Sequence, residues 1–217
     1  AVLVTIFGLT TALLDKLTPK EIWNNLKFQD LSERNIQEKN FSDWAKGAKS
    51  RNEKYDLVIG NPPFNKSLLG DFTNEDFKEL FNKKVPGNKL ALKFLEAALY
   101  FGDKTSMIIP SNILLYNKSN TAQQYRTELF TNHTVHKIYD FTHLRRGLFH
   151  KAADTPVVAL IIRSIPSSYQ SIEHIVVKRE LFSDKGIRFE IDYYDRHLVR
   201  WEWAIDEKKQ FVWKTNL

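Results

Sequence analysis

Hydrophobic and polar residues follow one another in blocks whose spacing predicts secondary structure. Residues 2–17 carry apolar side chains at near-helical intervals, which predicts a buried helix that ends before Pro19. A short second helix is predicted from Pro19 to Trp23. Residues 27–54 are polar and contain one weak strand candidate, Asn35–Phe41. The opening part of the chain therefore gives little indication of function.

Strands and helices alternate clearly from residue 55 onward. The most apolar strand is Tyr55–Gly60, and the helix expected over Asn88–Phe101 has its apolar residues on one face. Gly102 is expected at the C-cap of this helix. The other elements expected, in chain order, are a helix at Asn74–Phe81, a strand at Thr105–Ile109, a helix at Ser119–Asn132 and strands at Val135–Phe141 and Pro156–Arg163.

This order of elements predicts an α/β fold with a mostly parallel sheet. Only a loop, Thr142–Asp154, separates the last two strands. We therefore expect these strands to form an antiparallel hairpin at the edge of the sheet. After Pro166 the pattern changes to short alternations rich in aromatic residues, which indicates the start of a different module.

Composition narrows the class of protein. The chain has 217 residues, of which 42% are hydrophobic and 27% charged, as in an ordinary globular protein. The net charge of +6 permits a polyanionic partner such as nucleic acid. The absence of cysteine excludes disulfides and thiolate metal sites and fits a cytoplasmic protein. No apolar run approaches the roughly 20 residues that span a bilayer, so no membrane partner is expected.

The candidate chemistry lies directly after the strand Tyr55–Gly60, where Asn61, Pro62, Pro63 and Phe64 follow. Two prolines in series stiffen the backbone and remove two amide donors. The Asn61 amide oxygen and an adjacent proline carbonyl can therefore accept both hydrogens of one NH2 group, beside the flat ring of Phe64. Such a site would leave the nitrogen lone pair free to attack an electrophile without a strong base. A proline-rich turn after a buried strand is the alternative interpretation.

The sequence DLVIGNPPF resembles motif IV of the S-adenosylmethionine-dependent amino-methyltransferases. The segments SMIIPSNIL (Ser106–Leu114), VHKIYDF (Val135–Phe141) and GLFHKAADTPVVALIIR (Gly147–Arg163) resemble the strands and motif VIII that follow it. In this order they resemble gamma-class DNA adenine methyltransferases of restriction–modification systems, in particular the type IIG, Eco57I-like enzymes, in which an endonuclease is fused. The implied fold is a partial class I, Rossmann-like methyltransferase fold.

The resemblance implies the roles of several residues. Asn61 and Pro62 would bind the amino group of a flipped adenine in double-stranded DNA, and Phe64 and Phe149 would stack on its ring. Phe149 is otherwise a core residue before the last strand. Asn61 and Pro63 would also lie beside the cofactor, S-adenosylmethionine. The basic residues expected to contact DNA, unless they are merely solvated loop charges, are Lys66, Lys118, Arg145, Arg146 and Lys151.

The motifs that bind the cofactor in this family are missing or altered in this sequence. No glycine-rich motif I and no ribose-binding acid of motif II are found in the chain. The Asp-Phe pair of motif III is replaced by Asn40 and Phe41, with Asp43 as a fallback. We therefore expect residues 1–165 to be a partial, truncated catalytic domain and residues 166–217 a bridge toward a missing target-recognition domain. The chain alone is expected to bind the cofactor poorly and to be inactive.

Other functions stay open at this point. A non-catalytic DNA-binding or degenerate remnant would fit the missing motif I. A methyltransferase for guanine in RNA or for glutamine in protein would share the Asn-Pro-Pro-Phe chemistry, although a protein substrate would not need Phe149. His133 and His136 lack a third ligand, so no metal site is expected. The oligomeric state is not indicated by the sequence.

Overall fold

The computed structural model describes residues 18, 20, 36, 38–64, 72–111, 117, 119–144, 155–166, 171–178 and 193–204. The chain divides into a unit of Ala1–Trp44 and a unit of Ala45–Leu217, each described by itself. The helix expected over residues 2–17 lies outside the described residues. Of the second expected helix only Lys20 is described, and it is helical.

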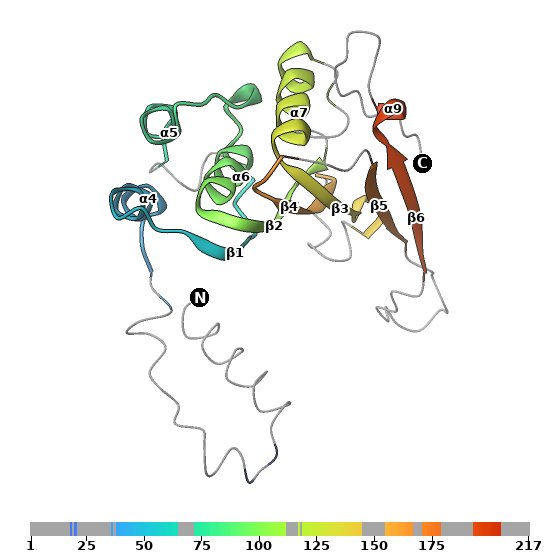
Figure 1. Cartoon of the computed structure of the whole chain (residues 1–217), viewed down its shortest axis with the longest axis horizontal. Coiled ribbons are helices and arrows are strands. Elements are labelled where there is room, and N and C mark those ends of the chain that lie inside the picture. The colour runs from blue at the N-terminus through green and yellow to red at the C-terminus, as the bar shows by residue number, and fades with distance from the viewer. Residues whose placement is uncertain are drawn as a thin grey trace. The chain divides into compact units, whose positions relative to one another are not determined.

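One six-stranded sheet organises the larger unit, in the order β1-β2-β4-β3-β5-β6 (Figure 1). β1, β2, β3 and β5 run in one direction, whereas β4 and β6 run in the other. The predicted α/β class with a mostly parallel sheet is therefore confirmed. The strands are β1 (Tyr55–Gly60), β2 (Gly102–Pro110), β3 (Thr134–Asp140), β4 (Val157–Arg163), β5 (Ser171–Lys178) and β6 (Tyr193–Arg200).

Helices α6 and α7 lie on the same side of this sheet (Figure 1), with α6 packed on β1 and β2 and α7 packed on β3. Ten residues of α6 are buried, because α6 also packs against α5 and the 3-10 turn η2. The described helices are α4 (Phe41–Ser50), α5 (Asn74–Phe81), α6 (Leu90–Phe101), α7 (Asn120–Asn132) and α9 (Trp201–Ala204), with 3-10 turns η2 (Pro86–Asn88) and η4 (Thr142–Leu144).

Local sequence explains where α5 and α7 begin. Thr73 and Asp76 form a reciprocal capping box at the start of α5. Ser119 caps α7 by accepting a hydrogen bond from the Ala122 amide at 3.3 Å. Both caps satisfy amide groups that the first turn of a helix leaves without a partner, so both boundaries are fixed by the sequence.

The two faces of the sheet differ in burial. On the face that α6 and α7 cover, Met107 is 4% exposed and Leu160 and Ile138 are fully buried. On the opposite face, Leu57 at 52% and Ile59 at 74% are well exposed. The sequence predicted a buried strand at Tyr55–Gly60, but β1 is half open because α6, the described helix that packs on it, covers only one of its faces.

The hairpin of β3 and β4 is antiparallel as predicted, but it does not lie at the edge of the sheet. β4 is inserted between β2 and β3, and β5 pairs with the free side of β3. The strands β5 and β6, which follow Pro166, extend the same sheet. The interpretation of residues 166–217 as a bridge toward a target-recognition domain stays a prediction.

One local prediction was wrong. The described residues of the weak strand candidate Asn35–Phe41 form no strand, because residues 38–40 are irregular and α4 begins at Phe41. Gly102 is the C-cap of α6, as predicted, and its amide donates to the Ala98 carbonyl; with φ −107° and ψ 138° it is extended and also begins β2. Its lack of a side chain matters for packing, since a Cβ there would lie 2.8 Å from Val58 Cγ2.

Candidate functional site

The segment Asn61–Phe64 leaves the sheet at the carboxyl end of β1. Asn61 is exposed, Pro62 is buried, and Pro63 and Phe64 are half-buried. A buried proline beside an exposed amide holds the Asn61 side chain at the surface, where it can meet a ligand. The carboxyl ends of parallel strands are where open α/β sheets place their ligands.

Gly60 is the last residue of β1, directly before this segment. A Cβ on Gly60 would lie 2.7 Å from the Met107 sulfur and 2.9 Å from its terminal methyl group. The end of the Met107 side chain occupies this space, so a larger residue at position 60 would require that flexible side chain to move.

Main-chain hydrogen bonds connect the neighbouring strand ends at the same edge. The Ser111 amide, directly after β2, donates to the Pro156 carbonyl at 2.9 Å, and the Phe141 amide donates to Val157 at 3.0 Å. The end of β2, the start of β4 and the end of β3 are thus held together. Asn61–Phe64 leaves β1 beside this connected edge, because Gly60 of β1 pairs with Met107 of β2.

Asp140 is a structural acceptor at this edge. Its carboxylate lies 3.4 Å from Nε2 of His174, and both side chains are buried. It also accepts a hydrogen bond from the Thr142 amide at 2.8 Å. Burial raises the pKa of Asp140, but the hydrogen bonds from His174 and Thr142 outweigh it and hold that pKa below its ordinary value. The carboxylate thereby fixes the η4 turn that follows β3.

Asn40 and Phe41, expected to contact the cofactor, begin α4. The Asn40 side-chain oxygen accepts hydrogen bonds from the amides of Ser42 at 2.8 Å and Asp43 at 3.3 Å, as an N-cap does. The ring of Phe41 contacts that of Trp44, with centroids 5.5 Å apart. These two hydrogen bonds satisfy the side-chain oxygen of Asn40, so the structure explains this residue without a cofactor contact. These residues belong to the smaller unit, so their expected role, like that of the fallback Asp43, stays a prediction.

Several of the expected site residues lie outside the described residues. Their roles in stacking on the base or contacting DNA stay predictions. They are Phe149, Lys66, Lys118, Arg145, Arg146 and Lys151.

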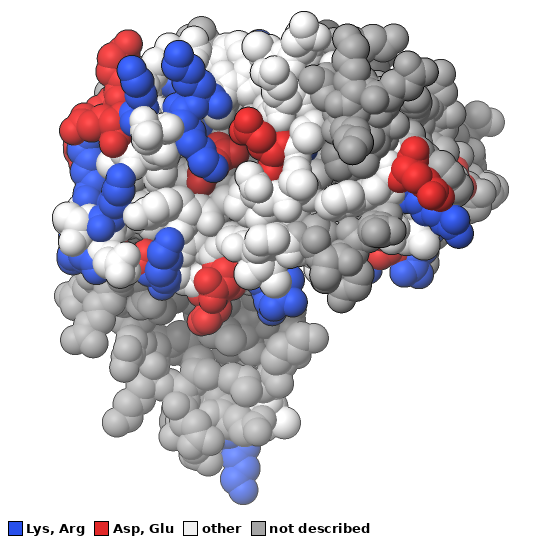
Figure 2. Space-filling model, turned by 45° about the horizontal axis from the view of Figure 1, so that its top comes forward, with Lys and Arg blue, Asp and Glu red and all other residues white. Residues whose placement is uncertain are grey.

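Charged side chains of both signs are interspersed on the face shown in Figure 2. The described part of the face shown therefore carries no uniformly basic surface. Among the described residues, three basic side chains are paired with acids: Lys46 with Asp76 at 2.8 Å, Arg51 with Glu53 at 2.6 Å, and Lys83 with Glu96 at 2.5 Å.

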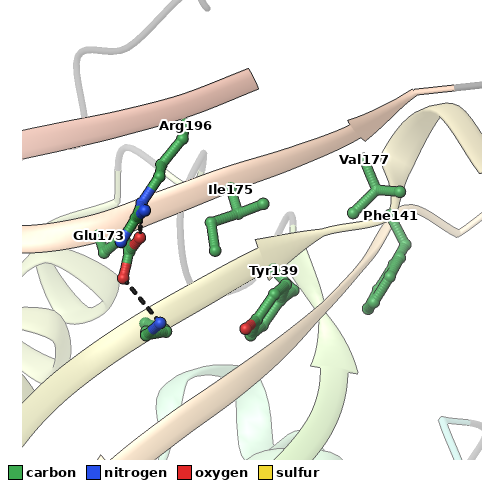
Figure 3. Close-up of a pocket in the computed structure, with 7 residues that line it drawn as sticks. Tyr139, Phe141, Glu173, Ile175, Val177 and Arg196 are labelled. Atoms are coloured by element: carbon green, nitrogen blue, oxygen red, sulfur yellow. Dashed lines mark ion pairs between the residues drawn. The ribbon is translucent and has the colours of Figure 1, made fainter. Parts of the chain in front are cut away.

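A pocket of about 450 Å³ lies away from Asn61, on the sheet face opposite α6 and α7. Glu173 is ion-paired with Arg196, which lies beside it in Figure 3, and with Lys137 at 3.0 Å. Burial raises the pKa of Glu173, but the hydrogen bonds from Lys137 and Arg196 lower it by more. The rings of Tyr139 and Phe141 line the apolar end with centroids 6.5 Å apart. These residues alternate along β3, β5 and β6, which the sequence analysis did not foresee.

Two further expectations concern metals and membranes. Among the described residues, no group of three or more His, Cys, Asp and Glu side chains could hold a metal ion. His133 is half-buried before β3, and His136 is exposed at an irregularity in its pairing with β4. Within the same part of the chain, no helix is long and apolar enough to cross a membrane.

The sheet defines an α/β protein, and the segment at the end of β1 is its candidate ligand site. The chain belongs to the Eco57I restriction-modification methylase family, whose sequence model matches residues 1–146. No curated protein matches the chain. The family assignment confirms the resemblance to Eco57I-like enzymes of restriction–modification systems.

Solved structures with similar folds come from related systems. The type IIG restriction endonuclease BpuSI has 19% identity and a TM-score of 0.49, covering 68% of this chain and 19% of that chain. The M protein of the type I restriction enzyme EcoKI has 17% identity and a TM-score of 0.42, with 60% and 26% covered. A type I methyltransferase subunit from Streptococcus thermophilus has 18% identity and a TM-score of 0.45, with 69% and 35% covered. The chain thus spans about a third or less of each of these proteins.

Proposed function

We propose that the protein transfers a methyl group from S-adenosylmethionine to the exocyclic amino group of an adenine in double-stranded DNA. This reaction would be the modification activity of a restriction–modification system. The observation that carries the proposal is the exposed Asn61 beside the buried Pro62 at the carboxyl end of β1, in a chain of the Eco57I methylase family. A fused nuclease of the type IIG kind, and a cytoplasmic location, remain part of this proposal.

The chemistry follows from the acceptors that this segment offers. The Asn61 amide oxygen and the Pro62 carbonyl each accept one hydrogen of the adenine NH2 group, so the lone pair of that nitrogen points away from them. Bound S-adenosylmethionine would supply the methyl group and would leave as S-adenosylhomocysteine when its sulfur–methyl bond breaks, and the methylated nitrogen would lose one proton to solvent. Catalysis comes from orientation and electrostatic fit, because neither acceptor removes the proton before attack.

The site at Asn61 and Pro62 fits a cofactor that supplies the electrophile, because its two acceptors hold only the nucleophilic amino group. The segment holds a nucleophile but contains no residue that could carry a methyl group itself. S-adenosylmethionine supplies an electrophilic methyl group when it is bound. Among the described residues of the larger unit, Asn61 and Pro63 would face it.

The target base must leave the duplex to reach Asn61, since its amino group is paired and stacked in DNA. Phe64 is half-buried next to Pro63, so part of its side chain is accessible, and its ring would stack on the flipped base. Stacking on an aromatic side chain contributes about 1–3 kcal/mol per base. This contribution is of the same order as the cost of unstacking the base.

Substitution of Asn61 in the full-length protein tests the proposal. Asn61→Ala should lower methyl incorporation into DNA at least about a hundredfold, the size seen when one oriented polar group is removed from a transition state. DNA binding in a gel-shift assay should stay within about twofold, because Asn61 contacts only the reacting group. Incorporation is measured with radiolabelled S-adenosylmethionine, and digestion of the DNA identifies the methylated nucleoside.

The control is Asn132→Ala, which removes another exposed asparagine at the opposite edge of the sheet, where α7 ends. It should leave methylation unchanged. Full activity of Asn61→Ala would refute the site. Label found in RNA or protein instead of DNA would refute the substrate, and absence of any transfer by the wild-type protein would favour a DNA-binding remnant.

A further inference from the structure

Ser111 carries a buried hydroxyl group at the edge of the sheet where Asn61 lies. It directly follows β2 and is fully buried. Its amide donates to Pro156, so the backbone position is fixed. Its hydroxyl oxygen has no hydrogen-bond partner in the structure. The sequence analysis quoted Ser111 within SMIIPSNIL (Ser106–Leu114) but gave it no role.

A buried hydroxyl without a partner destabilises a fold, because it gives up its hydrogen bonds to water and gains none. Nearly all buried polar groups in native proteins are satisfied, so an exception requires an explanation. One explanation is a partner that arrives only with a ligand. Hydrogen bonds at catalytic sites often form only in the complex with substrate.

The strand register places Ser111 at the same edge of the sheet as the base-binding segment. Gly60 of β1 pairs with Met107 of β2 in parallel. The pairing ends there, with Asn61 next on one chain and Ser111 four residues beyond Met107 on the other. Because the two strands are parallel, a base held at Asn61 and Phe64 would lie at the same edge of the sheet as the end of β2.

We propose that the Ser111 hydroxyl donates a hydrogen bond to a ring nitrogen of the target adenine. This inference rests on the function proposed above and adds a hydrogen bond by which the protein would recognise the base. A serine hydroxyl rotates freely and can donate one hydrogen bond, and the ring nitrogens of adenine are acceptors. Acceptors at Asn61 and Pro62 would hold the amino group, while a donor at Ser111 would hold the ring.

Thr105 provides a matched control on the same strand. It is also fully buried, and its hydroxyl is also without a hydrogen-bond partner. It lies in the interior of the sheet, opposite Val58 of β1 and Ile162 of β4, away from the strand end. Thr105→Val and Ser111→Ala therefore remove the same kind of group, one remote from the site and one within it.

The test uses the full-length protein and its methylated sequence, mapped first in DNA from cells that express it. Ser111→Ala should lower kcat/KM about tenfold, as expected for the loss of one hydrogen bond. Its melting temperature should equal or exceed that of the wild type, because an unsatisfied hydroxyl has been removed. Thr105→Val should likewise equal or exceed the wild type in melting temperature, for the same reason, but should keep wild-type activity.

Base analogues identify the contact directly. Oligonucleotides with 1-deaza-, 3-deaza- or 7-deaza-adenine at the target position each lack one ring nitrogen. One of them should lower wild-type activity about tenfold and leave Ser111→Ala unaffected, which marks the bonded nitrogen. If Ser111→Ala is less active than the wild type by the same factor on adenine and on each of the three analogues, the hydroxyl does not bond to a ring nitrogen and the base contact is refuted.

Two other results separate this inference from the proposed function. If the wild type methylates adenine and Ser111→Ala is fully active, the contact is refuted while the function stands. If the wild type methylates no adenine, both are refuted.

Discussion

The contact between Glu96 of α6 and Tyr125 of α7 should stabilise the protein measurably. Glu96 is buried, and its carboxylate accepts a hydrogen bond from the Tyr125 hydroxyl at 2.9 Å and pairs with Lys83 at 2.5 Å. Burial and the Glu96 carboxylate raise the pKa of Tyr125 well above its ordinary value. The phenol therefore stays protonated and acts as a donor under assay conditions.

The expected loss in the free energy of unfolding depends on which interactions each substitution removes and which groups it leaves without a partner. Tyr125→Phe removes a hydrogen bond to a charged acceptor, which contributes about 1.5–3 kcal/mol. Glu96→Leu leaves the buried Tyr125 hydroxyl unsatisfied, at a cost of about 1–3 kcal/mol. Lys83 is 54% exposed, so its ion pair contributes at most about 1 kcal/mol. The double variant should lose less than the sum, by about 1–2 kcal/mol, because the interaction is lost only once.

Urea unfolding followed by circular dichroism gives the free energy of unfolding for the two single variants and the double variant. Lys83→Ala is the control and should cost at most about 1 kcal/mol. A coupling energy below about 0.5 kcal/mol would show that the hydroxyl and the carboxylate do not act as a pair. The inferred connection between α6 and α7 through this hydrogen bond would then be wrong.

Two further predictions concern carboxylates. The pKa of Asp140 is lowered in the folded protein, so its stabilising contribution is present above the ordinary pKa of 3.8 and is lost as the pH falls through the folded value. Asp140→Asn should remove this part of the acid sensitivity, measured as the melting temperature against pH. The hydrogen bond from Lys46, followed by that from Thr73, lowers the pKa of Asp76 from 3.8 to about 2. Lys46→Ala should raise the pKa of Asp76 toward 3.8 in an NMR titration, and an unchanged value would contradict the pairing.

The position of the candidate site could be predicted from sequence because local chemistry determines it. Three consecutive apolar residues, a glycine and two prolines fix where β1 ends and where Asn61 begins. The exposure of Leu57 and Ile59 could not be predicted, because it depends on which elements cover each face of β1. An apolar run indicates burial on both faces, but α6, the described helix that packs on β1, covers only one of them.

The features that were missed depend on long-range packing or on capping. The helix α4 has few apolar residues and is marked mainly by the cap at Asn40, which the sequence analysis assigned to the cofactor. The place of β4 depends on pairing with both β2 and β3, which no local pattern encodes. The burial of Ser111 is equally invisible in sequence, since serine is usually exposed.

The insertion of β4 between β2 and β3 has a consequence for folding during synthesis. β2 ends at Pro110, but its neighbour β4 begins only at Val157, so roughly 47 residues must be made before that edge is paired. At a synthesis rate of about 5–20 residues per second, roughly 2–9 s pass between the synthesis of the end of β2 and that of the start of β4. During this time α6 can already cover one face of β2, while the edge of the strand stays open to other chains. Nascent chains of this protein are therefore most exposed to mispairing between the synthesis of β2 and that of β4.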